Sequence, residues 1–343
     1  MIRVSYEEAA ARMAEGLRPY LPPEEAMRLA RIFADNSADG VHSHGMNRFP
    51  RCVRDMRTGV CDPKVLRAER VSGLGGLEVW DAHFGVGPLI AEQMADRVSE
   101  LAEEHGIACC AVRSNSHWLR AGRYALRIAR RGMYALCFTN TSQNLTPWGA
   151  KANAIGNNPM TFSIPRGTKE PLLMDMSVSQ YAYGKLEIMA QQGQMLDEPL
   201  GYDTEGNLTR DPGAISASGL MLPIAKWKGN ALSIMLDFMA AGLSFGRTSL
   251  MIGPPDQGQA GMSQVYMAMN VSPLGDMDEA LRHMEASIDF LHSLKKEEGI
   301  PPLHIPGENL AETRRRNLED GLPVTEKTWA VIEELARAGR AVR

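Results

Sequence analysis

Cysteine is scarce in this chain, and its spacing disfavours a disulfide-stabilised domain. Five cysteines occur among 343 residues, Cys109 and Cys110 are adjacent, and no C-x-x-C pair is present. An odd and low number of cysteines does not build a disulfide framework. The pattern instead predicts reduced thiols and a cytoplasmic protein.

Basic excess, aromatic density and long apolar runs are lacking as well. Lys+Arg 37 against Asp+Glu 41 gives a formal net charge of -4, and aromatic residues make up 6% of the chain. These values disfavour nucleic acids and anionic membranes as partners. No apolar run approaches the roughly 20 residues of a transmembrane helix. The first segment, MIRVSYEEAAARMAEG, lacks the apolar core of a signal peptide.

Three nucleotide-binding or hydrolytic signatures are missing or incomplete. G-x-x-x-x-G-K-[ST] does not occur, which disfavours a P-loop NTPase, and the absence of G-x-S-x-G disfavours an α/β-hydrolase. Gly85-Val86-Gly87 follows a predicted strand and precedes a predicted helix, as in a dinucleotide-binding fingerprint. Ile90 stands where the third glycine belongs, so an ordinary turn is favoured over phosphate binding.

What the chain does contain is material for a sizeable core and an alternation of elements. With 44% hydrophobic residues it is long enough for two or three domains. Helices are predicted near both ends, the first opened by a capping box at Ser5 and the second by Pro22-Pro23. Between them strands alternate with helices, which indicates an α/β fold class. The predicted strands are 77–80, 107–112, 133–139, 159–164, 172–176 and 263–270; the later helices are 88–105, 121–131, 228–241, 276–298, 311–319 and 325–339; and 196–223 is a predicted long loop.

The densest polar segment is VHSHGMNRFPR, residues 41–51, between two predicted helices. With Ser43 as N-cap, His44 and Arg48 fall at i and i+4 on one face of the second helix. A guanidinium suits a carboxylate and a histidine delivers a proton near neutral pH, so a 2-oxo acid could be held and protonated here. A capped helix with a solvated arginine explains the same residues. Metal binding by His42 and His44 is disfavoured because no Cys, Asp or Glu lies at a helpful spacing.

Further polar segments follow predicted strands, where open α/β sheets place their ligands. They are Arg113–Trp118, Thr139–Ser142, Pro147–Gly149, Gly156–Pro159, Met174–Ser177 and Lys226–Gly229. Such groups could meet a nicotinamide, a ribose or a cofactor phosphate. Ordinary turn chemistry, a helix cap at Asp175 or a solvated lysine explains the same residues, and for the segments at Thr139, Pro147, Gly156 and Asp175 that explanation is favoured at this point.

The order of these segments resembles the malate/L-lactate dehydrogenase-like family over about residues 5–335. The residues that carry the resemblance are Ser43-His44-Gly45 with Arg48, Asn115-Ser116-His117, Thr139-Asn140, Pro147-Trp148-Gly149, Asn158-Pro159, Asp175-Met176-Ser177, Asp203 with Gly206-Asn207, Lys228-Gly229 and Pro306-Gly307-Glu308. Trp118 and Ala225-Lys226-Trp227 depart from most of the family, and they are similar to its subgroup that reduces a diketo sugar acid.

The resemblance implies a distinct, non-Rossmann NAD(P)-binding fold with a large mixed sheet, usually assembled as a homodimer and active in cytoplasmic sugar-acid catabolism. We expect an α/β cofactor-binding domain over residues 76–299. Residues 1–75 together with 300–343 are expected to form a mainly helical domain for substrate and dimer contacts.

The same resemblance implies roles for individual residues. His44 is the expected proton donor, His117 an acid/base residue and Arg48 the contact to the substrate carboxylate, with His117 or Asp203 as the partner of His44. The expected cofactor contacts are Thr141, Asp175, Met176, Ser177, Trp227, Lys228, Pro306, Gly307 and Glu308. No metal is expected.

The expected reaction is reduction of the 2-oxo group of a small sugar acid by NADH, with NADPH possible. Two alternatives stay open. The substrate could be another 2-oxo acid or a cyclic imine acid, or the chain could be a non-catalytic small-molecule binding protein.

Overall fold

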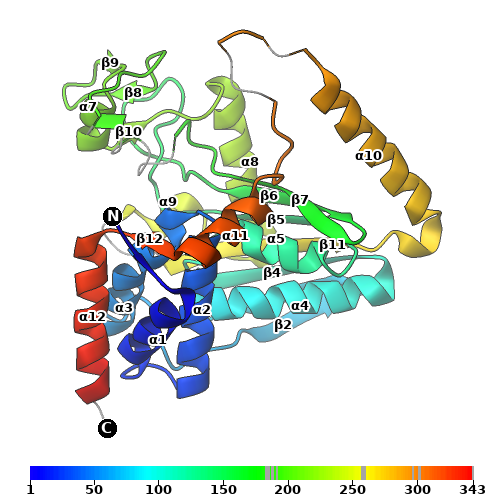
Figure 1. Ribbon diagram of the computed structural model, residues 1–343, viewed down its shortest axis with the longest axis horizontal. Helices are drawn as coiled ribbons and strands as arrows, with labels where there is room; N and C mark the ends of the chain where they lie inside the picture. The colour runs from blue at the N-terminus through cyan, green and yellow to red at the C-terminus, as the bar shows by residue number, and fades with distance from the viewer. Residues whose placement is uncertain are drawn as a thin grey trace.

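A seven-stranded mixed sheet forms the centre of the computed structural model, which describes residues 1–181, 186, 189–190, 192–255, 260–295, 297–299 and 303–341 (Figure 1). Its strands run in the order β2-β3-β4-β11-β5-β6-β7. Strands β3 and β4 pair in parallel, and the remaining neighbours pair antiparallel. The strand bounds are β2 Glu69–Leu74, β3 Leu77–Asp81, β4 Ile107–Ser116, β5 Tyr134–Thr139, β6 Met160–Arg166, β7 Lys169–Met176 and β11 Ala260–Met269. The predicted α/β class with a large mixed sheet is confirmed.

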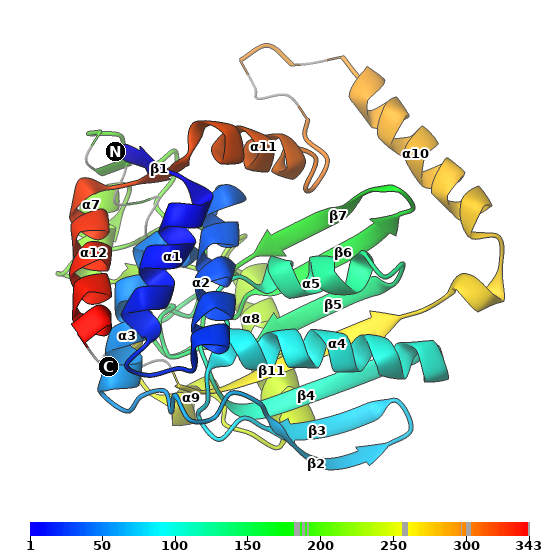
Figure 2. The ribbon, with the colours of Figure 1, turned by 60° about the horizontal axis from the view of Figure 1, so that its bottom comes forward.

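Helices cover both faces of this sheet (Figure 2). Helices α4 (Gly87–His105) and α5 (Ala121–Ala129) pack on one face, and α8 (Trp227–Ser244) packs on the other. Along β4, Cys110 and Val112 belong to the core beneath α4 and α5, while Cys109 and Ala111 belong to the core beneath α8. Burial on both faces explains why this strand is a continuous apolar run in the sequence rather than an alternating one.

The two ends of the chain form a helical layer beside the sheet (Figure 2). Helices α1 (Tyr6–Leu17), α2 (Pro23–Ala38), α3 (Phe49–Arg57) and α12 (Glu326–Ala341) share one apolar core. Strand β1 (Ile2–Val4) pairs antiparallel with β12 (Leu322–Val324), which joins the ends directly. The predicted cap is confirmed, because the Ser5 hydroxyl accepts a hydrogen bond from the Glu8 amide at 3.2 Å. The division into two domains stays a prediction; β2, on the N-terminal side of the predicted boundary, is part of the sheet.

The predicted loop 196–223 is wrong, because this segment is folded. Strands β8 (Gly201–Tyr202), β9 (Leu208–Thr209) and β10 (Leu220–Met221) form a three-stranded sheet beside α7 (Pro212–Ser218). Strands of two residues are too short to give a hydrophobic period. The remaining described helices are α9 (Ser249–Ile252), α10 (Met277–Ser293) and α11 (Leu310–Asp320), and α10 stands out from the rest of the molecule (Figure 1). In the described part of the chain no helix has the length and apolar character to cross a membrane.

Gly85 and Gly87 are explained by close packing where the chain enters α4. A Cβ on Gly85 would lie 2.4 Å from the Val65 carbonyl oxygen, and a Cβ on Gly87 would lie 2.6 Å from the Ser116 carbonyl oxygen. The Gly87 amide also donates to the Ser116 hydroxyl at 2.8 Å. These contacts hold the start of α4 against the end of β4. His117, one of the predicted site residues, follows directly after that end.

Candidate active site

His44 lies in a short irregular turn between α2 and α3. The predicted single helix carrying His44 and Arg48 at i and i+4 is wrong, since two 3-10 turns, His42–His44 and Met46–Arg48, are separated at Gly45. A Cβ on Gly45 would lie 2.1 Å from the Ser37 hydroxyl, so the chain passes very close to the end of α2. The Asn36 side-chain amide donates to the His44 carbonyl at 3.0 Å and fixes the turn.

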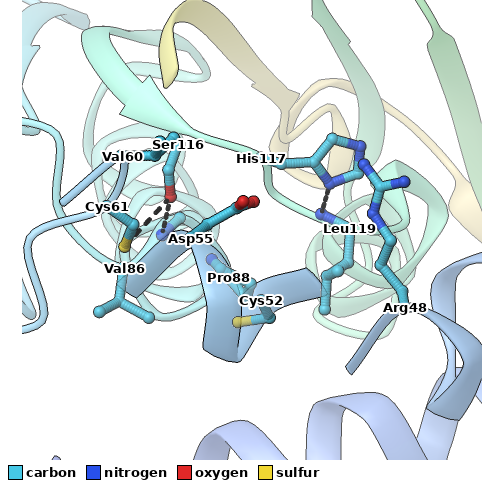
Figure 3. A pocket seen from close by; sticks show the side chains of 11 residues that line it. Arg48, Cys52, Asp55, Val60, Cys61, Val86, Pro88, Ser116, His117 and Leu119 are labelled. Atoms are coloured by element: carbon cyan, nitrogen blue, oxygen red, sulfur yellow. Dashed lines mark hydrogen bonds between the residues drawn. The ribbon is translucent and has the colours of Figure 1, made fainter. Parts of the chain in front are cut away.

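His117 follows the last residue of β4, as predicted for a ligand-facing strand end. Its neighbour Trp118 is buried against the rings of Tyr124 and Tyr266, with centroid separations of 6.0 and 5.6 Å. Leu119 has a φ of 69°, a left-handed conformation that is uncommon for a branched residue. This conformation lets the Leu119 amide donate to Nδ1 of His117 at 3.0 Å, so neutral His117 carries its proton on Nε2 (Figure 3).

The two histidines form a stacked pair beside Arg48. Their ring centroids are 5.5 Å apart with an interplanar angle of 17°, and the Arg48 guanidinium lies next to the His117 ring (Figure 3). Burial, Arg48 and Arg120 lower the pKa of His44 to about 4, and burial and Arg48 also lower the pKa of His117. Burial lowers the pKa of Arg48 itself to about 10, which leaves it cationic at neutral pH. The structure therefore brings His44, Arg48 and His117 together, and their roles stay predictions.

Arg120 is a buried cation that the predicted residue set did not include. It pairs with Asp39 at the end of α2, and its Nε lies 3.4 Å from Oδ2 of Asp175 near the end of β7. The Gly122 amide donates to Asp175 at 3.0 Å. Burial raises the pKa of Asp175 while Arg120 opposes that rise. Arg120 thus joins three elements at the edge of the histidine pair, and its position three residues after His117 was the available signal.

Asp175 also lies in a pocket with the predicted segment Pro306–Glu308. The Leu173 amide donates to the Pro306 carbonyl at 3.1 Å, and a Cβ on Gly307, whose φ is 87°, would lie 2.7 Å from the Leu173 nitrogen. Glu308 lies 2.8 Å from Nε2 of His292 and 2.8 Å from Nδ1 of His304. The structure therefore brings Asp175, Pro306, Gly307 and Glu308 together from two distant parts of the chain.

Thr141 and Ser177 are held by short polar networks at the ends of β5 and β7. The Thr141 hydroxyl donates to the Asn157 side chain at 3.0 Å, and its amide donates to Asn158 at 2.9 Å. The hydroxyls of Ser177 and Ser179 are 2.8 Å apart. Met176 pairs with β6 as the last residue of β7.

Three predicted residues make their contacts elsewhere. Trp227 and Lys228 begin α8 with exposed side chains, and the Lys228 ammonium lies 5.9 Å from the Trp227 ring centroid. Asp203 lies in the exposed turn between β8 and β9, where it accepts hydrogen bonds from the amides of Glu205 and Asn207 at 2.9 and 2.8 Å. These backbone bonds give Asp203 a local role in the turn.

Metal ligands do not gather in the described part of the chain, where no group of three or more His, Cys, Asp or Glu side chains could hold an ion. The His44–Arg48–His117 cluster offers carboxylate binding and acid–base chemistry instead of metal binding. A guanidinium can bind a carboxylate, and two imidazoles beside it can polarise or protonate a neighbouring oxygen.

Comparison with known proteins identifies the family. The family model described as malate/L-lactate dehydrogenase matches residues 4–333. The chain belongs to the malate/L-lactate dehydrogenase family.

Two relatives with 35 and 36% identity carry the same substrate in their names. The chain is 35% identical over 335 residues to 2,3-diketo-L-gulonate reductase from Haemophilus influenzae. The aligned region covers 97% of this chain and 100% of the relative. It is 36% identical over 313 residues to the enzyme of the same name from Citrobacter koseri, covering 91% and 93%. The match makes this chain an oxidoreductase of the family that acts on 2-hydroxy and 2-oxo acids.

Solved structures of the family share the fold. A putative malate/lactate dehydrogenase from E. coli superposes with a TM-score of 0.89 at 24% identity, covering 99% of this chain and 96% of that one. The Δ1-piperideine-2-carboxylate reductase from Pseudomonas syringae superposes with a TM-score of 0.86 at 26% identity, covering 98% and 100%. This agreement accounts for the incomplete glycine fingerprint, because the sheet order and strand directions differ from a Rossmann domain.

Proposed function

We propose that this enzyme reduces the 2-oxo group of 2,3-diketo-L-gulonate to give 3-keto-L-gulonate, with NADH as the preferred reductant. The observation that carries the proposal is the stacked pair His44–His117, 5.5 Å between centroids, beside the half-buried cation Arg48. Relatives at 35 and 36% identity carry this substrate in their names. Reduction of a cyclic imine acid is the second candidate, supported by the structural likeness to the piperideine-2-carboxylate reductase.

Arg48 orients the substrate in this proposal. Its planar guanidinium binds the C1 carboxylate through two parallel N–H bonds, which sets the adjacent C2 carbonyl beside the imidazoles. A bound carboxylate also compensates the charge of Arg48, which is one of the causes that lower the pKa of His44. Substrate binding therefore makes protonation of His44 easier at the moment when a proton is needed.

His44 is the proposed proton donor, and His117 is its neutral partner. The Leu119 amide points at Nδ1 of His117 at 3.0 Å, so a second proton on that ring would face a donor. Nδ1 of His44 faces instead the Ser43 hydroxyl at 2.9 Å, which can donate or accept. His44 can therefore hold either protonation state, whereas His117 is suited to donating a hydrogen bond from Nε2 to the C2 oxygen.

The residues around Asp175 fit a nicotinamide cofactor. The carboxylate of Asp175, which lines this pocket with a side chain 21% exposed, offers an acceptor for ribose hydroxyls. The close approach at Gly307 offers a cradle that a side chain would fill. We propose that Asp175, Met176, Ser177, Thr141 and the segment Pro306–Glu308 hold the cofactor, with Trp227 and Lys228 at its rim. When bound, the cofactor supplies the hydride that reaches C2. Carboxylates at Asp175 and Glu308 suit a ribose diol better than a phosphate, which favours NADH over NADPH.

Asp203 completes the proposed catalytic set as a secondary partner of His44. Its exposed carboxylate accepts the backbone amides of its own turn. Because these bonds hold Asp203 in its own turn, we propose a contribution smaller than that of His117.

We also propose a cytoplasmic homodimer. Helix α8 buries small residues against the sheet and exposes large apolar ones, among them Met235, Phe238 and Met239 at 57, 59 and 44% exposure. A row of exposed apolar side chains on one helix face marks an interaction surface. The five free cysteines suit a reducing compartment. Light scattering on the wild type and on a Phe238→Glu variant tests the assembly, since a dimer through α8 would dissociate in the variant.

The test of the function is NADH oxidation by the purified protein, followed by nicotinamide absorbance. The substrates are 2,3-diketo-L-gulonate, piperideine-2-carboxylate, pyruvate and oxaloacetate, each also with NADPH. We expect the highest kcat/KM for diketogulonate with NADH. Preference for the imine acid would keep the site and replace the substrate. No oxidation with any of the four would contradict the proposed catalytic role.

A further inference from the structure

A second charged group faces the cavity that contains Arg48 and His117. The cavity is lined by Arg48, Cys52 and Asp55 from the segment that forms α3, and by Ser116 and His117 at the end of β4. Figure 3 shows the Asp55 carboxylate between His117 and Arg48 on one side and Ser116 with Cys61 on the other. Positions 48, 52 and 55 recur at the spacing of one helix face, which explains why these three side chains share the cavity.

The carboxylate of Asp55 has capacity for a further hydrogen bond. Its side chain is 15% exposed, Arg54 donates a hydrogen bond to Oδ1 at 3.4 Å, and Arg51 lies 3.9 Å from Oδ2. Neither contact is a close bidentate pair, and a carboxylate accepts about four hydrogen bonds.

The other walls near Asp55 are neutral. Burial raises the pKa of the Cys61 thiol to about 12 and raises that of Cys52 as well, so both thiols stay protonated. The Ser116 hydroxyl is already used, since it donates to the Gly85 carbonyl at 2.7 Å and accepts from the Gly87 amide at 2.8 Å. Arg48 and Asp55 are thus the charged groups that line this cavity, one of each sign.

We propose that Asp55 selects the substrate by the group it carries beyond the 2-oxo carbon. This inference rests on the proposed function, in which Arg48 binds the C1 carboxylate. Asp55 then accepts a hydrogen bond from a hydroxyl on the substrate chain and repels a second carboxylate placed there. The favoured substrate class is the monocarboxylic hydroxylated 2-oxo acids, and the disfavoured class is the dicarboxylic 2-oxo acids.

The cavity is small, and its lining carries one cation, Arg48, and one anion, Asp55, so it can neutralise one substrate carboxylate but not two. A second carboxylate entering it would lose water and meet a like charge, whereas a hydroxyl would give Asp55 a donor. A site built to hydrogen-bond a hydroxyl discriminates strongly against analogues that lack it.

The experiment uses three substrates that differ at C3: pyruvate with hydrogen, hydroxypyruvate with a hydroxyl and oxaloacetate with a carboxylate. For Asp55→Asn we expect kcat/KM for oxaloacetate to rise about tenfold and that for pyruvate to change less than about threefold. For Asp55→Ala we expect kcat/KM for hydroxypyruvate to fall about tenfold relative to pyruvate. Glu104→Gln is the control, because it removes a negative charge from a side chain that is 73% exposed at the far end of α4.

A binding measurement separates this inference from the proposed function. The thermal upshift caused by glycerate, lactate and malate reports on the same C3 groups without turnover. Wild-type protein should be stabilised more by glycerate than by malate, and Asp55→Asn should reduce that difference.

The outcomes are distinct. If wild-type enzyme reduces 2-oxo acids and Asp55→Asn leaves the ratio of oxaloacetate to hydroxypyruvate unchanged, Asp55 does not select the substrate and the proposed function stands. An equal fall for all three substrates also overturns the selective role. If no 2-oxo acid is reduced, the proposed function fails, and the glycerate and malate upshifts in the two proteins still decide whether Asp55 discriminates between a hydroxyl and a carboxylate.

Discussion

The end of β4 and the start of α8 both carry predicted site residues, yet they differ in how these residues are held. At β4, His117 is stacked on His44, receives the Leu119 amide at 3.0 Å and shares a cavity with Arg48. At α8, Trp227 and Lys228 are exposed and contact each other. Burial, Arg48 and His44 all lower the pKa of His117, so the side chains at the end of β4 already interact. Trp227 and Lys228 would gain further contacts from a bound ligand or a second subunit. Substitutions in the two regions should therefore differ in size.

The largest loss of activity is expected for His44→Ala. Removing the proposed proton donor should lower kcat about 10²–10⁴-fold while leaving the cofactor dissociation constant nearly unchanged. Stopped-flow turnover and cofactor fluorescence measure the two quantities. His42→Ala is the matched control, since burial alone lowers the pKa of His42 and no neighbouring charge contributes. Equal losses in the two variants would remove the special role of His44.

Arg120→Met should give the largest loss of stability. The variant breaks the largely buried pair Arg120–Asp39, whose side chains are 4 and 12% exposed, and it removes the cation beside Asp175. Asp39 keeps its second partner, Arg314, at 2.8 Å. Breaking a buried pair in this way costs about 3–5 kcal/mol. Denaturant unfolding measures the change, and adding Asp175→Asn should recover part of it.

Arg127→Met is the control for Arg120→Met. Arg127 pairs with Asp96 at 2.5 Å, with side-chain exposures of 45 and 36%. Exposed pairs contribute about 0–1 kcal/mol. Losses of the same size at Arg120 and Arg127 would show that the central ion pair is no more important than a surface one.

Arg48→Lys tests whether the two parallel donors of the guanidinium, rather than its charge alone, bind the substrate carboxylate. Lysine keeps the charge but loses the planar pair of donors that a carboxylate accepts. We expect kcat/KM for the 2-oxo acid to fall about 10- to 100-fold, mainly through KM. An unchanged KM with a lowered kcat would mean that Arg48 does not bind the carboxylate.

The stacked histidines should also make stability depend on pH. The pKa of His44 is lowered to about 4 in the folded, substrate-free protein and is about 6.5 in an unfolded chain. The unfolded state therefore binds the extra proton between these values, so this contribution to stability is complete above pH about 6.5 and is lost as pH falls towards about 4. Unfolding midpoints between pH 7.5 and 4 should fall less steeply for His44→Asn than for wild type. Parallel curves would contradict the lowered pKa.

The smallest effect is expected at the exposed region. Lys228→Ala should raise KM for NADH only about two- to fivefold, because an exposed lysine contributes about 1 kcal/mol or less to an ion pair. Lys169→Ala, at a site 60% exposed and paired with Glu285, controls for the loss of a surface charge. A hundredfold loss at Lys228 would show that α8 contributes to catalysis as strongly as the pocket.

Much of the fold was predictable because most helices and strands are long enough to show a period or a cap. Ser5 marks a helix start where the sequence predicted one, and Gly106, at φ 78°, follows α4 directly after the predicted end at residue 105. The short strands β8, β9 and β10 escaped prediction because two residues carry no period. The irregular turn at His44 also escaped, since it depends on the approach of Gly45 to Ser37, a tertiary contact.

In the candidate site, too, some residues could be predicted from the sequence, and others depend on tertiary contacts. His44, Arg48 and His117 were predicted because the order of their segments resembles the family, and because histidine and arginine suit proton transfer and carboxylate binding. Arg120 and Asp55 were not, because their importance comes from which side chains they meet after folding: Asp39 and Asp175 for one, and the cavity beside Arg48 for the other. Charged residues on a helix are usually solvated, so sequence alone gives no reason to single them out.

The most direct test of the central claim is the fate of the hydride. Wild-type enzyme, NADH carrying two deuterium atoms at the nicotinamide C4 and 2,3-diketo-L-gulonate are incubated, and the product is analysed by mass spectrometry with fragmentation. The account predicts one deuterium at C2 of 3-keto-L-gulonate, with the rate of its appearance greatly lowered in His44→Ala. Deuterium at another carbon, or none in the product, would contradict it.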